Sequence, residues 1–321
     1  MTKKTVLKAV VSITAILIIV KTISGESITN YNLKLSFSYL ASVFLVSLVN
    51  MGIITYKWQL IIHSNKVAIG FFNLVKVYYI SNFFAQVTPI IVGDSMRAYH
   101  LSKYTQEKMN SIGSVLWVRL TGFLAQMILI LISLPFVVAL GYKFILTVAF
   151  LIVSVFILLA IIIMNPSEVA SLILKLSRLH KKLHFLHYLE KFSVHMMEYS
   201  RNKKFFFIVL LLSILDHLTR IVACYLISLS IGFNLNFFYF LIFTPIAMMV
   251  QMVPISLGGT GIREGTYMIL FTKVGLSSVE ALVLSIFTYI MTIITTLPGL
   301  YFFLAGTKSG SKIAEIKYQS D

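Results

Sequence analysis

The sequence PISLGGTGIRE at residues 254–264 interrupts a long hydrophobic part of the chain. The sequence PIIVGDSMR at residues 89–97 follows the same plan, with a proline, a glycine four residues later and an arginine beside or near a carboxylate. A helix that breaks in hydrocarbon leaves backbone groups without partners, which is tolerated only inside protein or beside water. The two stretches therefore predict functional helix breaks at Pro89, Gly93, Pro254 and Gly261.

The composition around these stretches is that of a membrane protein. Of the 321 residues, 58% are hydrophobic and 12% are charged, and the mean hydropathy is +0.91. No soluble domain has enough interior for this apolar fraction. The fold class predicted is an all-α polytopic membrane protein that forms one integral membrane domain over residues 1–321.

Hydrophobic runs predict six transmembrane spans, because a bilayer core of about 30 Å needs roughly 20 apolar residues in a helix. The spans are expected at residues 5–23, 36–56, 112–134, 144–164, 204–231 and 278–304. Two further apolar segments, 71–92 and 237–257, end in the helix breaks. The lysines before the first run also resemble the start of a signal peptide, but the absence of a clear cleavage site favours a retained helix.

The distribution of positive charge orients these spans. The formal net charge is +16, and the basic residues lie between apolar runs, at 57–66, 97–108, 175–204 and 308–317. Scattered basic loops do not form a nucleic-acid-binding groove, but they fit the positive-inside rule. All of them fall on one side of the membrane if both termini are cytoplasmic and 71–92 enters and returns. We therefore predict multi-pass insertion in the cytoplasmic membrane.

This orientation also predicts an internal symmetry. The N-terminal half, 5–164, would contain a re-entrant helical hairpin at about 71–97 that enters from the cytoplasm. The C-terminal half, 204–304, would contain a second hairpin at about 237–265 that enters from the opposite side. Such an inverted-topology repeat is typical of transporters with a site near the middle of the membrane. The alternative is that proline and glycine breaks recur by chance in apolar sequence.

Residues 165–203 separate the two halves and predict a basic amphipathic segment on the cytoplasmic surface. Its four histidines include helical spacings, which suit either metal binding or a solvated face. No carboxylate or cysteine completes a metal shell there, so the solvated face is favoured. The single cysteine, Cys224, excludes an internal disulfide. We expect no metal and no cofactor.

Charged residues near the breaks are candidate ligands for a lipid headgroup. Arg97, Arg119 and Arg263 would bind an anionic group, since arginine pairs bidentately with phosphate. Free backbone N–H groups at Gly258 and Gly259 would assist them. Alternatively, Asp94 and Glu264 pair with the arginines and only hold the halves together, and Arg119 only reaches towards the membrane surface.

Three polar residues, Asp216, His217 and Arg220, fall near the middle of span 204–231. Asp216 and Arg220 are four residues apart, so they can pair on one helix face. One interpretation is an internal ion pair that joins helices. The other is a relay for protons or for the headgroup, with His217 as the titrating group.

The segments around the breaks resemble the transmembrane-region family of lysylphosphatidylglycerol synthase, which is flippase-like. The matching sequences are NFF at 82–84, TP at 88–89, GDSMRA at 93–98, VRL at 118–120 and VPISLGGTGIREG at 253–265. The family often has a second glycine where this chain has Asp94. The resemblance implies movement of aminoacylated lipid or related lipids between leaflets. It does not imply synthase activity, because we expect the soluble aminoacyl-transferase domain to be absent.

The leading hypothesis is a flippase-like transporter for an anionic or phosphate-containing lipid, which would be a phospholipid, an aminoacylated lipid or a lipid-linked glycan. No nucleotide-hydrolysis or metalloprotease motif occurs, so we expect no enzyme activity. The alternative is an accessory subunit that presents lipid to a lipid synthase or glycosyltransferase partner through residues 165–203. A third hypothesis, a lipid-carrier transferase, would need Glu264 as its catalytic base.

Overall fold

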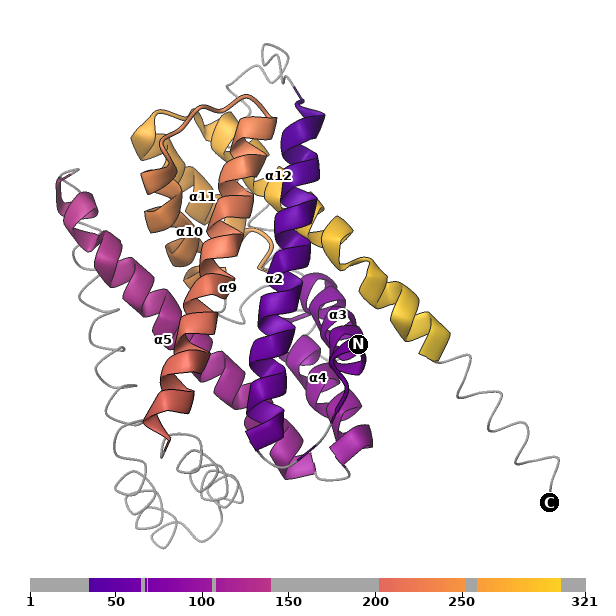
Figure 1. Ribbon diagram of the computed structural model, residues 1–321. Helices are drawn as coiled ribbons and strands as arrows, with labels where there is room; N and C mark the ends of the chain where they lie inside the picture. The colour runs from indigo at the N-terminus through magenta and orange to yellow at the C-terminus, as the bar shows by residue number, and fades with distance from the viewer. Residues whose placement is uncertain are drawn as a thin grey trace, which may run out of the picture.

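The computed structural model describes residues 35–64, 67, 69–105, 108–139, 202–251 and 259–306, and these contain helices and no strand. The helices run α2 Phe37–Ser64, α3 Phe71–Val87, α4 Ile90–Thr105, α5 Lys108–Ala139, α9 Lys203–Ser230, α10 Phe237–Gln251, α11 Ile262–Phe271, the 3₁₀ turn η2 Thr272–Val274, and α12 Ser278–Thr296 (Figure 1). Residues 298–306 are helical again after a turn at Leu297.

Four helical stretches are long and apolar enough to cross a membrane, at Phe37–Ser64, Asn110–Ser133, Lys203–Ser230 and Ser278–Gly306. They correspond to four of the six predicted spans. The other two, 5–23 and 144–164, lie outside the described residues, as does nearly all of the segment 165–203. The protein is a multi-pass helical membrane protein, and that part of the predicted fold is confirmed.

One span is longer than predicted, with consequences for the site. The sequence placed its end at residue 56, but α2 continues to Ser64. The additional turns are stabilised by apolar contacts, because Trp58, Ile61 and Ile62 are buried in a core cluster with α3 and α5. Lys57, which the charge pattern predicts in a basic loop, is instead a buried residue within α2.

Helices α2 and α9 pack side by side and antiparallel (Figure 1). At one end the backbone N–H of Ser36 donates to the carbonyl of Ser230 at 2.8 Å. Towards the other end Val209 of α9 joins Trp58 of α2 in one apolar cluster. Because these two helices come from different halves of the chain, their contact joins the halves along their length.

Helices α3 and α4 form a tight helical hairpin. The chain breaks at Thr88, whose N–H still donates to Phe84 at 2.9 Å, and Pro89 cannot supply the next helical donor. The close packing of the two helices requires Gly93, since a Cβ there would lie 2.6 Å from both the carbonyl oxygen of Ser81 and the Cβ of Ala85. The break predicted at Pro89 is present, whereas Gly93, also predicted as a break, lies within α4, where it allows the close approach to α3.

The second break is described in part. Residues 252–258, which include Pro254 and Gly258, lie outside the described residues. Gly259 and Gly261 have positive φ angles of 78° and 86°, a conformation that favours glycine. Helix α11 starts immediately after Gly261, and the carboxylate of Glu264 accepts from the N–H of Gly261 at 2.6 Å. Helices α10 and α11 pack against each other on either side of this break.

Each of these two helix pairs also contacts a long helix from the other half of the chain. In α5, Gln126 donates through Nε2 to the carbonyl of Pro245 in α10 at 2.5 Å. In α12, the hydroxyl of Tyr289 donates to the carbonyl of Gln86 in α3 at 3.2 Å. Beyond the turn after α12, Gly299 lies so close to Tyr79 that a Cβ would come within 2.1 Å of its carbonyl oxygen. The contacts between the halves are therefore reciprocal.

Candidate functional site

A cavity of about 300 Å³ lies where these helices converge, within the size range of ligand sites. Side chains from α2, α3, α4, α5, α9, α10, α11 and α12 line it. Five of the lining side chains are cationic: Lys57, Arg97, Arg119, Arg220 and Arg263. The only carboxylate among the described residues that line the cavity is Asp216. The lining thus carries an excess of positive charge inside an apolar protein.

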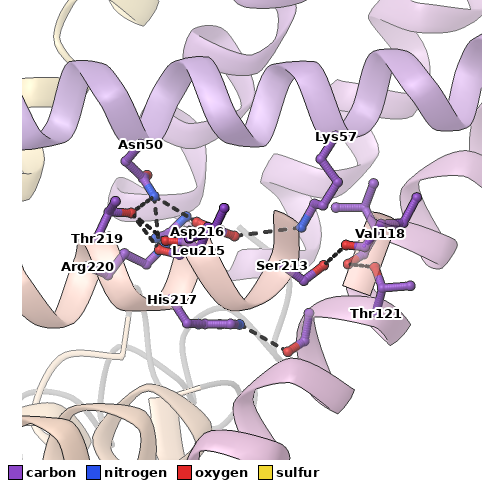
Figure 2. Close-up of polar contacts among 12 residues, drawn as sticks. Asn50, Lys57, Val118, Thr121, Ser213, Leu215, Asp216, His217, Thr219 and Arg220 are labelled. Atoms are coloured by element: carbon purple, nitrogen blue, oxygen red, sulfur yellow. Dashed lines mark hydrogen bonds and ion pairs between the residues drawn. The ribbon is translucent and has the colours of Figure 1, made fainter. Parts of the chain in front are cut away.

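Asp216 is the centre of a polar cluster between α2 and α9 (Figure 2). Its carboxylate lies 3.7 Å from the ammonium of Lys57 and 2.9 Å from Nε of Arg220. It also accepts a hydrogen bond from Nδ2 of Asn50 at 2.8 Å, and Asn50 donates to Thr219 at 2.7 Å. One negative charge is shared by two cations, so the cluster has a net positive charge.

The α3–α4 hairpin contributes a second charged group. The guanidinium of Arg97 lies 4.0 Å from the ring centroid of Tyr78, and its Nε donates to the Ser81 hydroxyl at 3.3 Å. Asp94 lies 4.0 Å from Arg97 and binds Nε of Arg119 at 2.7 Å. Arg119 and Asp94 are about a quarter exposed, with side-chain exposures of 27% and 22%. Asp94 thus bridges two arginines of the cavity.

Arg263 of α11 has closely similar surroundings. Its guanidinium lies 4.1 Å from the ring centroid of Tyr289, and its Nε donates to the Ser285 hydroxyl at 3.3 Å. It also pairs with Glu264. Arg97 and Arg263 therefore share one arrangement, in which a tyrosine ring, a serine hydroxyl and a nearby carboxylate fix a buried arginine. Cation–π contact of this kind is stronger where water is excluded.

His217 contacts other residues than its neighbour Asp216 does. Its Nε2 lies 3.0 Å from the carbonyl oxygen of Gly122 in α5, and Figure 2 shows the ring on the opposite side of α9 from Asn50 and Lys57. Of the three predicted relay residues, the structure pairs Asp216 with Arg220 and places the hydrogen bond of His217 elsewhere. The relay stays a prediction.

The other predicted site residues are the three arginines, the two carboxylates and the two glycines of the second break. Arg97, Arg119 and Arg263 line the cavity, whereas Asp94 and Glu264 pair with these arginines without lining it. Gly259 lies near Gln251, a lining residue, with a Cβ position 3.2 Å from its side chain. Gly258 lies outside the described residues.

Several lining residues are not predicted by the sequence pattern. Lys57 is predicted in a loop, and the predicted site does not include Asn50, Gln126, Tyr78 or Tyr289. A signal existed for two of them, because Asn50 and Lys57 are seven residues apart and so lie on one helix face. No group of three or more His, Cys, Asp or Glu that could hold a metal occurs within the part of the chain described.

The comparisons with known proteins agree with the fold and the expected resemblance. A family model described as the lysylphosphatidylglycerol synthase TM region matches residues 5–299. No curated protein and no solved structure matches the chain. The match covers most of the 321 residues, including both helix breaks and all the cationic residues of the cavity. The chain belongs to the lysylphosphatidylglycerol synthase TM region family.

Proposed function

We propose that the protein is a flippase-like transporter, rather than an enzyme, that moves an anionic or phosphate-containing lipid between the leaflets of the cytoplasmic membrane. One observation carries the proposal: among the described residues, five cationic side chains line a cavity of about 300 Å³ between helices able to span the bilayer, and they exceed the carboxylates there even when Asp94 and Glu264 are counted with Asp216. Burying unbalanced charge is costly, so cations at membrane depth mark a site for an anionic partner. A phosphate headgroup supplies the missing negative charge.

The arginines are suited to phosphate because a guanidinium donates two parallel hydrogen bonds to its oxygens. Arg97 and Arg263 are already oriented by Tyr78 and Tyr289, so little ordering is needed when a ligand arrives. Arg119 is the least buried of the three and is held by Asp94. In the proposed mechanism the phosphate competes with Asp94 for Arg119, and Asp94 takes the arginine back when the lipid leaves.

The proposed architecture is the inverted repeat, with α3–α4 and α10–α11 as re-entrant hairpins and both termini in the cytoplasm. Three observations support it. Helices α2 and α9 pack antiparallel, Arg97 and Arg263 have matching partners, and each hairpin contacts a long helix of the opposite half. A site between two such halves can be exposed to each leaflet in turn by rocking one half against the other.

The matched family is consistent with this proposal, because its description names a membrane region of a protein that synthesises a lipid. The cavity, rather than the family, indicates which part of the lipid is recognised. Its cations would select the phosphate, and the hydrocarbon tails would remain in the surrounding lipid.

Reconstituted vesicles test the function directly. Fluorescently labelled phosphatidylglycerol in the inner leaflet is protected from a membrane-impermeant quencher, so loss of protection reports movement. Lys57→Gln and Lys204→Gln each remove one positive charge, but Lys57 lines the cavity and Lys204 is exposed at the start of α9. We expect the parent and the Lys204 variant to move the lipid and the Lys57 variant to be slower. Vesicles in which the parent protein moves no lipid would refute the proposal.

A further inference from the structure

Two buried hydrogen-bond acceptors that line the cavity have no partner in the part of the chain that the structure describes. Nδ1 of His217 and Oε1 of Gln126 are buried atoms without a hydrogen bond, and their residues are 8% and 0% exposed. Both residues line the cavity. A buried polar atom without a partner destabilises the protein, and two of them beside one cavity point to a ligand that binds them.

The hydrogen bonds on the other side of each group identify both atoms as acceptors. Nε2 of His217 faces the carbonyl of Gly122 at 3.0 Å, and a carbonyl only accepts, so Nε2 carries the proton. The neutral imidazole then has its lone pair at Nδ1. In the same way, Nε2 of Gln126 donates to the carbonyl of Pro245, which leaves Oε1 as the free acceptor. A ligand must therefore bring donors to this region.

Helix α5 connects this region to the cationic part of the cavity. Arg119, Gly122 and Gln126 are spaced at i, i+3 and i+7, so they lie along one face of the helix. At 1.5 Å per residue, Arg119 and Gln126 are separated by about 10 Å along the axis. A single phosphate cannot reach both positions, but a headgroup with its phosphate near Arg119 and a polar substituent extending along α5 can do so.

Charge decides which kind of donor fits. Lys57 and Arg220 bind Asp216, the residue before His217. Even when Asp94 and Glu264 are counted with Asp216, the five cations among the described lining residues exceed these three carboxylates. A ligand ammonium in this field would be repelled, whereas a neutral hydroxyl donates to the same acceptors without that repulsion.

We propose that the cavity selects phosphate headgroups that carry hydroxyl groups, as in a glycerol or other polyol phosphate, over headgroups that carry an ammonium or no donor. The hydroxyls donate to Nδ1 of His217 and Oε1 of Gln126 while the phosphate binds the arginines. This specificity rests on the proposed lipid transport. A site built to bind a hydroxyl rejects an analogue without one, because its buried acceptors are then left unpaired.

Lipid binding to the purified full-length chain tests the selectivity without requiring transport. Native mass spectrometry would compare phosphatidylglycerol with phosphatidylpropanol, which has the same charge and number of headgroup carbons but no hydroxyl. Phosphatidylethanolamine provides the ammonium. We expect phosphatidylglycerol to bind about tenfold more tightly than either. Soluble glycerol phosphate is the fourth ligand, and binding as tight as that of the lipid would contradict the lipid-specific part of the proposal.

Two variants separate hydroxyl recognition from phosphate recognition. His217→Phe keeps the aromatic ring without its nitrogen acceptor, and Gln126→Met keeps the length of the side chain without its amide. Each should reduce the preference for phosphatidylglycerol over phosphatidylpropanol to about two- or threefold. Arg119→Gln is the control, because it should weaken both lipids alike and leave the preference unchanged.

The same lipids in reconstituted vesicles distinguish failure of this inference from failure of the proposed function. Movement of both lipids at equal rates, with equal binding, would overturn the hydroxyl selectivity and leave lipid transport intact. A parent protein that moves no lipid would overturn transport. If that protein still binds phosphatidylglycerol tenfold more tightly, and both variants lose this preference, the headgroup assignment is supported. Equal binding of all four ligands would overturn the selectivity whatever the vesicles showed.

Discussion

Asp216 of α9 lies between two cations from different helices, with its Oδ2 3.7 Å from the ammonium of Lys57 and its Oδ1 2.9 Å from Nε of Arg220. The side chains of Lys57 and Asp216 are 1% and 6% exposed. The buried pair of Lys57 and Asp216 therefore links the two halves of the chain.

Asp216→Asn should therefore destabilise the protein strongly. It would leave Lys57 buried without a counterion, and breaking a buried pair in this way costs about 3–5 kcal/mol. Thermal unfolding in detergent, followed by intrinsic fluorescence, would measure the loss. The double variant with Lys57→Met removes the unpaired ammonium and should regain part of the stability. A single Asn variant as stable as the parent would show that the pair is not needed.

Asp94→Asn should strengthen the binding of an anionic lipid. Asp94 occupies Arg119 at 2.7 Å, so neutralising it removes the competitor for the phosphate. Arg119→Gln should have the opposite effect and weaken binding. We expect a change of several-fold in each direction, measured as lipid retained by the purified protein. Two shifts in the same direction would argue against competition between Asp94 and the ligand.

Tyr289→Leu should slow lipid movement, whereas Tyr289→Phe should retain most of it. The ring of Tyr289 lies against Arg263 at 4.1 Å, and phenylalanine keeps this ring. Cation–π contact contributes about 0.5–2 kcal/mol, so loss of the ring should reduce affinity by roughly 2- to 30-fold. The phenylalanine variant loses only the hydrogen bond to Gln86, worth about 1 kcal/mol. Vesicle assays with both variants check the difference, and equal activities would rule out the ring as the source.

Gly93→Ala should separate α3 from α4. Its Cβ would lie 2.6 Å from the carbonyl oxygen of Ser81, and such overpacking costs about 1–3 kcal/mol. Gly52→Ala is the matched control, because Gly52 lies in α2 and nothing lies within 4 Å of a Cβ there. The unfolding temperature should fall in the Gly93 variant and rise slightly in the Gly52 variant, since alanine favours a helix over glycine. A stable Gly93→Ala protein would indicate that the hairpin can open without loss.

The sequence predicted those features that depend on neighbouring residues. Hydrophobic runs identified the four spans, proline and glycine identified the break after α3, and the i, i+4 spacing identified the pair of Asp216 with Arg220. Each of these follows from local backbone geometry or from the thickness of the bilayer.

The remaining features depend on contacts between distant segments. Asn50 and Lys57 reach Asp216 only because α2 and α9 pack antiparallel. Bilayer thickness predicts that the span ends at residue 56, which would place Lys57 at a membrane surface. In the structure α2 continues to Ser64, because its last turns are buried against neighbouring helices. Tyr78 and Tyr289 looked like ordinary apolar residues, since nothing in the sequence shows that an arginine lies on their rings.

The polar cluster between α2 and α9 also restricts how the two halves can move. Sliding one helix along the other by a single turn, about 5.4 Å, would separate Asp216 from Lys57 and from Asn50 together. The apolar contacts alone would tolerate such a slip far better, because they have little directionality. A tilt of one half about the cluster would keep these bonds, so the rocking movement in the proposed transport would have its axis close to Asp216.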